Sequence, residues 1–201
     1  GDLRTRTGED PSADFESAIA DLTRALTLDP DHASALVARA KARADWCLWR
    51  SARGLESTAH FAAALADLDR AIAINPRESA YWTWRGKLRV NSGLGLEARG
   101  GDPEPLYRGG VDDLTHALEL DPGSTDAVQT RGRAHTNLGD WRRRQGKGAA
   151  DADEAAEADL ARALALDASE AITWQYRGDL RQSRGAARQA GGGDPQELYA
   201  A

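Results

Sequence analysis

The most regular feature of the sequence is a ten-residue segment whose apolar side chains recur at intervals of three and four. It reads DLTRALTLDP at 21–30 and returns as DLDRAIAINP at 67–76, DLTHALELDP at 113–122 and DLARALALDA at 159–168. Each copy begins 46 residues after the copy before it. The apolar spacing predicts one helix per copy, and the fixed interval predicts a repeat protein.

A second helical pattern follows each of these segments. It reads ASALVARAKARADW, SAYWTWRGKLRVNS, TDAVQTRGRAHTNL and EAITWQYRGDLRQS. We call positions that lie 46 residues apart equivalent, and one set of equivalent positions here holds only small residues: Ala40, Gly86, Gly132 and Gly178. Because a glycine inside a helix costs about 1 kcal/mol relative to alanine, its recurrence predicts close contact with another helix.

The repeated unit is therefore a helix, a turn, a second helix and a second turn, with no strand pattern. Tandem units of this kind predict an all-α fold, a helical solenoid that forms one array over residues 1–201. We expect a truncated unit at 1–30, full units at 31–76, 77–122 and 123–168, and, at 169–201, a terminal first helix with the start of a second. The turns between units are predicted at 29–33, 75–79, 121–125 and 167–170.

A family resemblance supports this interpretation. The run Trp82, Arg85, Gly86, then Gly93, Gly110, Leu114, Ala117 and Asp121-Pro122, resembles the tetratricopeptide repeat, and GDW at 139–141 is similar to the end of that family's first helix. The resemblance covers essentially the whole chain, but the family's usual unit has about 34 residues. It implies a right-handed superhelix of helical hairpins, in which one side of the first helices lines a concave groove.

The surplus of about twelve residues per unit lies after Gly93, Gly139 and Gly185. Each inserted stretch combines a helix-compatible half, a glycine break and a new helix start. We expect the first helix to run about a turn beyond its usual end in some units, and the second to begin at least a turn early. Asp102-Pro103 and Asp194-Pro195 have the pattern of an N-cap and a first helical residue, and Glu197 completes a capping box.

The composition narrows the class of function. The chain has 32 acidic and 26 basic residues, a formal net charge of −6 and no basic stripe, so we expect no nucleic-acid partner. No apolar run has the length of a membrane span, and no signal peptide is visible. The single cysteine, Cys47, suits a reducing compartment, and a cytoplasmic location is predicted. The absence of methionine indicates a fragment of a longer protein, and 23 arginines against three lysines suggest a GC-rich genome.

No pattern in the sequence predicts an enzyme, a cofactor or a metal. The glycine-rich segments 93–101 and 191–195 follow no strand and lack the lysine and hydroxyl of a phosphate-binding loop. The four histidines occupy unrelated positions without metal-ligand spacing, so we expect them on the surface. Cys47 is predicted to fill the core, and Arg142 to Arg144 to form a solvated helix face.

Two sets of equivalent polar positions predict ion pairs. One carries Asp21, Asp67, Asp113 and Asp159, and the other Arg39, Arg85, Arg131 and Arg177. Each aspartate precedes its turn position by nine residues and each arginine follows it by nine, so an antiparallel hairpin would bring them together. We expect partly buried pairs that fix the register between consecutive units, although pairing within a unit is also geometrically possible.

A further set of equivalent positions predicts a peptide site. Lys41, Lys87, Arg133 and Asp179 are followed four residues later by Asp45, Asn91, Asn137 and Ser183, on the same helix face. In some members of the family that the chain resembles, lysine or arginine with asparagine one turn later holds the acidic C-terminus of a peptide; Asp45 departs from that pattern. The predicted contact residues are Lys41, Thr83, Lys87, Asn91, Gln129, Arg133, Asn137, Gln175 and Asp179. Surface charge without a ligand is the alternative.

The sequence therefore favours a non-catalytic scaffold that binds a peptide or helix of a partner protein along its first helices, with an acidic or C-terminal carboxylate as the favoured end. The alternative is self-assembly by end-to-end stacking, or a regulatory array within a larger protein. In the resembled family such arrays are often fused to bacterial catalytic domains, including protein kinases. The oligomeric state is left open, and size measurement separates the two classes.

Overall fold

The structure is a computed structural model that describes residues 10–55 and 58–190. All regular structure in these ranges is helical, which confirms the prediction of an all-α fold. The helices are α2 (Ser12–Leu28), α3 (Ala33–Ser51), α4 (Thr58–Ile74), α5 (Ser79–Ala98), α6 (Glu104–Leu120), α7 (Thr125–Arg144), α8 (Ala150–Leu166) and α9 (Ala171–Ala190). None of them is long and apolar enough to cross a membrane.

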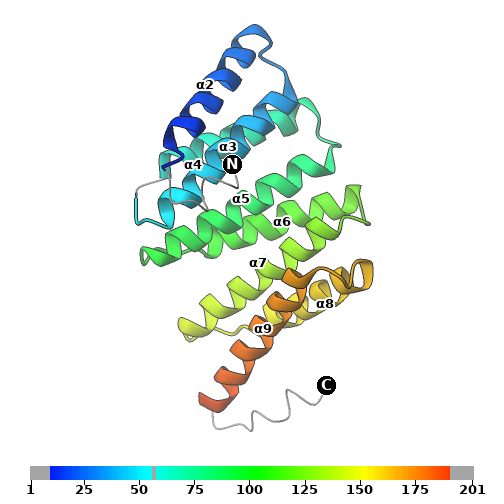
Figure 1. The fold of residues 1–201 in the computed structure, drawn as a ribbon. Helices are drawn as coiled ribbons and strands as arrows, with labels where there is room; N and C mark the ends of the chain where they lie inside the picture. The colour runs from blue at the N-terminus through cyan, green and yellow to red at the C-terminus, as the bar shows by residue number, and fades with distance from the viewer. Residues whose placement is uncertain (1–9, 56–57, 191–201) are drawn as a thin grey trace.

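The helices follow one another in a row, from α2 at one end to α9 at the other (Figure 1). Each packs against the next, and the most extensive contacts join the two helices of a unit, in the hairpins α3–α4, α5–α6 and α7–α8. The first helices also contact one another, α3 with α5, α5 with α7 and α7 with α9. The predicted turns between units are confirmed, because helices end at residues 28, 74, 120 and 166 and restart at 33, 79, 125 and 171.

The inserted residues lengthen both helices of a hairpin and join them through a repeated glycine turn. Both α5 and α7 run five residues past the glycines at 93 and 139, as the sequence predicts. Three first helices, α3, α5 and α7, are then followed by a glycine in the left-handed conformation: Gly54, Gly100 and Gly146, with φ of 69°, 78° and 67°. The next backbone N–H donates to the carbonyl five residues back, from Leu55 to Arg50, Gly101 to Leu96 and Lys147 to Arg142. This is the Schellman closure, which the glycine permits.

The start of α6 lies one residue later than predicted, at Glu104, with Pro103 at the N-cap position, but Asp102 still bonds to the first turn. Asp102 Oδ1 accepts a hydrogen bond of 3.0 Å from the backbone N–H of Glu104, and Pro103 directly precedes the helix. The equivalent cap at Asp194-Pro195, with Glu197, and the predicted start of a last second helix lie outside the described residues.

The close helix contact expected at the small residues occurs in two hairpins. A Cβ atom on Gly86 would lie 2.7 Å from Leu114 Cγ, and one on Gly132 would lie 2.9 Å from Leu160 Cγ. Both leucines are fully buried. At Gly178 no atom outside its own helix backbone lies within 4 Å of that position among the described residues, and the segment that follows α9 lies outside them, so close contact there stays a prediction. Cys47 is fully buried as expected, and burial raises the pKa of its thiol to about 12.

Candidate functional site

Each hairpin in the middle of the array contains an aspartate that faces an arginine and a second basic residue. Asp113 on α6, whose side chain is 3% exposed, accepts hydrogen bonds from Arg85 Nε (3.0 Å) and Nη2 (2.6 Å) and from Arg89 Nη1 (2.7 Å). Arg89 also donates to the Gly109 carbonyl at 3.0 Å. The equivalent groups are Arg39, Arg43 and Asp67 in the preceding hairpin and Arg131, His135 and Asp159 in the following one.

These pairs form within a hairpin, so the expectation that the arginine–aspartate pairs join consecutive units is corrected. Arg39 on α3 binds Asp67 on α4 and not Asp21, whose side chain is exposed and forms no hydrogen bond or ion pair with the residues described. Arg177 on α9 instead donates to Glu157 on α8 at 2.9 Å. The physical reason is burial, because the two helices of one hairpin share the broader contact and the aspartates lie inside it.

The same arginines nevertheless tie each hairpin to the one before it. Arg85 Nη1 donates to Asp69 Oδ1 at 2.7 Å, on the second helix of the preceding unit. Arg39 and Arg131 make the same contact with the threonine hydroxyls at positions 23 and 115, at 3.0 and 3.1 Å. Each guanidinium therefore contacts two hairpins at once. Sequence reasoning missed both the acceptor set at 23, 69 and 115 and the second basic set at 43, 89, 135 and 181, although each set is spaced at the 46-residue interval.

His135 takes the place that arginine holds in the two preceding hairpins. Its Nε2 lies 3.9 Å from Asp159 Oδ2, and its Nδ1 is buried without a hydrogen-bond partner among the described residues. Burial lowers the pKa of His135, although the Asp159 carboxylate acts in the opposite direction. The prediction that this histidine lies on the solvated surface is therefore wrong, and Asp159 has only one strong cationic partner, Arg131.

The first part of the predicted peptide site lies between α3 and α5. The ammonium groups of Lys41 and Lys87 lie 4.0 and 4.9 Å from the centre of the Trp84 ring. Burial and the neighbouring Lys87 lower the pKa of Lys41. A pocket of about 140 Å³ opens beside this ring, lined by Lys41, Asp45, Leu48, Trp84, Lys87 and Asn91. Three predicted contact residues therefore share one pocket, and Trp84 is a member that the sequence did not single out.

The second part lies between α5 and α7, where the predicted residues bind one another. Lys87 Nζ donates to Asp126 Oδ2 at 2.6 Å, and Arg133 Nη2 donates to Asn91 Oδ1 at 3.0 Å. Arg133 also lies 5.8 Å from the centre of the Tyr176 ring on α9. Lys87 and Arg133 therefore lie along the same contact between first helices, but each already has a partner within the chain.

Two donors on α7 lack such a partner. The Nε atom of Arg133 and the amide nitrogen of Asn137 are both buried, and no described atom accepts a hydrogen bond from either. The two residues are four apart, so their side chains lie on one face of α7. Buried donors without acceptors are uncommon because each costs about 1–3 kcal/mol.

The remaining predicted contact residues lie in three different environments: buried, joined to another first helix, or exposed. Thr83 is buried and donates to the Ser79 carbonyl of its own helix, so its prediction as a contact residue is wrong. Gln129 on α7 donates to Thr173 on α9 at 2.5 Å and joins two first helices. Gln175 and Asp179 are exposed on α9.

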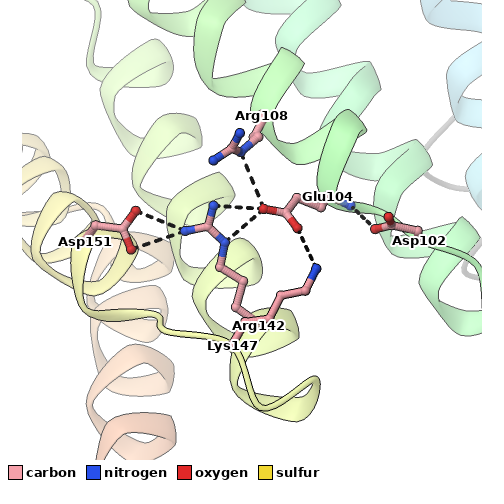
Figure 2. Close-up of polar contacts among 6 residues, drawn as sticks. All are labelled: Asp102, Glu104, Arg108, Arg142, Lys147 and Asp151. Atoms are coloured by element: carbon pink, nitrogen blue, oxygen red, sulfur yellow. Dashed lines mark hydrogen bonds and ion pairs between the residues drawn. The ribbon is translucent and has the colours of Figure 1, made fainter.

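Arg142 on α7 is the centre of a separate polar cluster that joins α6, α7 and α8 (Figure 2). It donates to Glu104 Oε1 on α6 from Nε and Nη2, at 3.1 and 2.9 Å, and to both oxygens of Asp151 on α8, at 3.2 and 3.0 Å. Lys147 and Arg108 reach the same Glu104 carboxylate. Hydrogen bonds from Arg142 lower the pKa of Glu104. Arg142 is 7% exposed, so its interpretation as part of a solvated helix face is wrong.

Comparison with known proteins gave no match: no family model matches the chain, and a search of curated proteins found none either. The tetratricopeptide resemblance therefore rests on the equivalent residues themselves.

Proposed function

We propose that the chain is a tetratricopeptide-like, right-handed solenoid that acts as a non-catalytic interaction scaffold. Its ligand is an extended peptide with an acidic end or a free C-terminal carboxylate, bound along α3, α5 and α7. The observation that carries the proposal is the placement of two ammonium groups, Lys41 and Lys87, over one indole ring, Trp84, beside a pocket.

The charge of this pocket favours an anion. Burial is the main cause of the lowered pKa of Lys41, and repulsion from Lys87 adds to it. A carboxylate placed between them would remove that repulsion and gain charge-assisted hydrogen bonds from both. Repulsion between two cations in the unbound protein is therefore a source of affinity for an acidic ligand.

The shape and lining of the pocket favour an apolar side chain next to that carboxylate. Leu48, Leu68 and Leu88 contribute to its wall, and Leu48 is 43% exposed at the rim. A C-terminal leucine offers both groups, because its side chain would enter the pocket while its carboxylate meets the lysines. An apolar pocket with a few polar groups is the usual form of such sites.

The peptide would continue toward α7. Arg133 Nε and the Asn137 amide nitrogen are donors without acceptors among the described residues. Carbonyl or carboxylate oxygens of a bound peptide would accept hydrogen bonds from them. Asp126 is the internal competitor, because it already binds Lys87; its side chain is 52% exposed and can leave. Binding is thus an exchange of one carboxylate for another at Lys87.

The test is calorimetric titration of the whole chain with a synthetic peptide of about eight residues that carries glutamates and a C-terminal leucine. We expect this peptide to bind. The same peptide with a C-terminal amide should bind at least about tenfold more weakly. Lys87→Glu and Arg133→Glu should each remove binding without changing helix content. Lys147→Glu is the matched control, because Lys147 also stacks on a tryptophan, Trp141, at 4.3 Å, away from the pocket.

Equal binding by the acid and amide peptides, or equal loss in the Lys147→Glu control, would refute the site. The cytoplasmic location, the lack of a nucleic-acid partner and membership in a larger, kinase-containing protein stay predictions from the sequence.

A further inference from the structure

One face of α9, the last described helix, has no described helix packed on it, although the equivalent face is covered in every preceding hairpin. Gly86 and Gly132 lie directly beneath leucines of the following helix, whereas no described atom comes within 4 Å of a Cβ position on Gly178. Trp174 on the same face is 51% exposed, and the equivalent Val128 is completely buried.

The charged groups of this face lack their usual partner. Arg177 and Arg181 are equivalent to Arg85 and Arg89, which enclose the buried carboxylate of Asp113 on the following helix. On α9 the two arginines instead share Glu157 Oε1 of the preceding helix, at 2.9 and 3.2 Å. The face therefore presents two cations, an aromatic ring and an open glycine in the arrangement that elsewhere receives a second helix.

The first described helix, α2, carries the complementary residues. Asp21 and Leu22 are equivalent to Asp67 and Leu68, which are 5% and 2% exposed inside the α3–α4 hairpin. In α2 the aspartate is exposed, and the leucine is only partly buried. No hydrogen bond or ion pair joins the Asp21 side chain to a described residue.

We propose that α2 of one copy of this chain docks on α9 of a second copy, in the way that α4, α6 and α8 dock on the helix before them. Asp21 then lies between Arg177 and Arg181, and Leu22 lies over Gly178. The charges are complementary, and the two faces are the two halves of a contact that the array already makes three times.

The geometry requires two copies. The helices α2 and α9 lie at opposite ends of the row, so they cannot meet within one molecule (Figure 1). The contact uses different surfaces on the two partners, so each added copy exposes the same pair of faces again. Such a head-to-tail contact forms open chains, or rings where the rotation closes. This inference is independent of the proposed peptide site, because no groove residue takes part in it.

The experiment is sedimentation velocity on the whole chain, from about 1 μM to about 1 mM. We expect a mass that rises with concentration and passes beyond a dimer. Gly178→Leu should keep the chain monomeric, because the new side chain occupies the space of Leu22. Gly148→Leu is its control, since Gly148 is also open within 4 Å but lies in the α7–α8 loop, and it should associate like the unmodified chain.

A charge exchange makes the test specific. Asp21→Arg alone should be monomeric, and so should the double variant Arg177→Asp with Arg181→Asp, because each places like charges at the contact. A mixture of the two should associate again, since every α2 then finds an α9 of opposite charge.

A chain that stays monomeric over the whole range overturns the proposal. So does association that survives Gly178→Leu, or a mixture of the charge variants that remains monomeric. A monomer whose helix content falls in Gly178→Leu would assign this face of α9 to the chain's own residues 191–201.

Discussion

Arg85 on α5 and Asp113 on α6 are joined by two parallel hydrogen bonds, Nε to Oδ2 at 3.0 Å and Nη2 to Oδ1 at 2.6 Å. Two bonds between planar groups fix the rotation of one helix against the other as well as their separation. A buried pair of this kind is costly to break, because the partner that remains is left charged and unsolvated. The stability of the array should therefore depend strongly on the aspartate.

Asp113→Asn should lower the free energy of unfolding by about 3–5 kcal/mol, because Arg85 and Arg89 would both lose their carboxylate inside the hairpin. Urea unfolding followed by circular dichroism measures the change. Asp69→Asn is the matched control, since Asp69 binds the same Arg85 but is 57% exposed, and its loss should cost less than about 1 kcal/mol. Similar small losses in both variants would show that burial does not decide the cost.

Arg85 and Arg131 occupy equivalent positions, but their loss should lower the free energy of unfolding by different amounts. Arg85→Ala leaves Arg89 on Asp113, so we expect a loss of about 1–3 kcal/mol in the free energy of unfolding. Arg131→Ala leaves Asp159 with only His135, whose nearest ring nitrogen is 3.9 Å away, so its loss should be larger. The comparison is made at pH 8 by urea unfolding. Equal losses in the two variants would mean that Arg89, the second cation at Asp113, contributes nothing to stability.

Much of the fold could be predicted from the sequence because the repeat is nearly regular. The helix ends at the four Asp-Pro-type turns follow from apolar spacing and turn residues, which are local. The partner of each arginine could not be predicted in the same way. Asp21 and Asp67 are both plausible partners of Arg39 by spacing, and the decision depends on which helix pair buries more surface, a property of the packed fold.

The candidate site shows a similar limit. Lys87, Asn91 and Arg133 were predicted from their spacing, and they do lie along one helix contact. Their internal partner Asp126 was missed because it stands near the start of α7 and has no carboxylate at the equivalent position of α5. Arg142 was misjudged because the lengthened α7 carries it beyond the usual end of a first helix, where Glu104 and Asp151 enclose it.

Gly132 and Gly178 should respond in opposite ways to the same substitution. Gly132→Ala would place a Cβ 2.9 Å from Leu160 Cγ, so we expect a loss of about 1–3 kcal/mol in the free energy of unfolding. Gly178→Ala meets no described atom and should gain about 0.5–1 kcal/mol from helix propensity. Thermal unfolding at low protein concentration measures both. A gain at Gly132 would contradict the close packing of α7 against α8.

The stability of the chain should fall between pH 7 and pH 5, partly because of His135. Burial lowers the pKa of His135 below its ordinary value of about 6.5. As pH falls through that value, the unfolded chain binds a proton before the folded chain does, so the free energy of unfolding decreases. His135→Gln should reduce this slope in urea unfolding without removing it, because burial also lowers the pKa of His60. An unchanged slope would contradict the buried, neutral state of His135.

Asp126→Asn should strengthen binding of an acidic peptide, because Lys87 would lose its internal carboxylate and remain available. We expect an increase of about three- to tenfold in affinity, corresponding to the modest value of a half-exposed ion pair. Affinity in both the variant and the unmodified chain should fall with added salt. Calorimetric titration at two salt concentrations measures both effects. Weaker binding by Asp126→Asn would show that Asp126 contacts the peptide itself or that the pocket lies elsewhere.

The glycine turns that close the first helices make the array extensible by whole blocks. Residues 101–146 begin just after one left-handed glycine, Gly100, and end at the next, Gly146, so the chain enters and leaves this block with the same geometry. A gene duplication of that block would add one hairpin whose arginine meets a threonine or aspartate of the hairpin before it. No new type of contact would be needed. The chain could therefore vary in length among descendants by steps of 46 residues while its local packing stays the same.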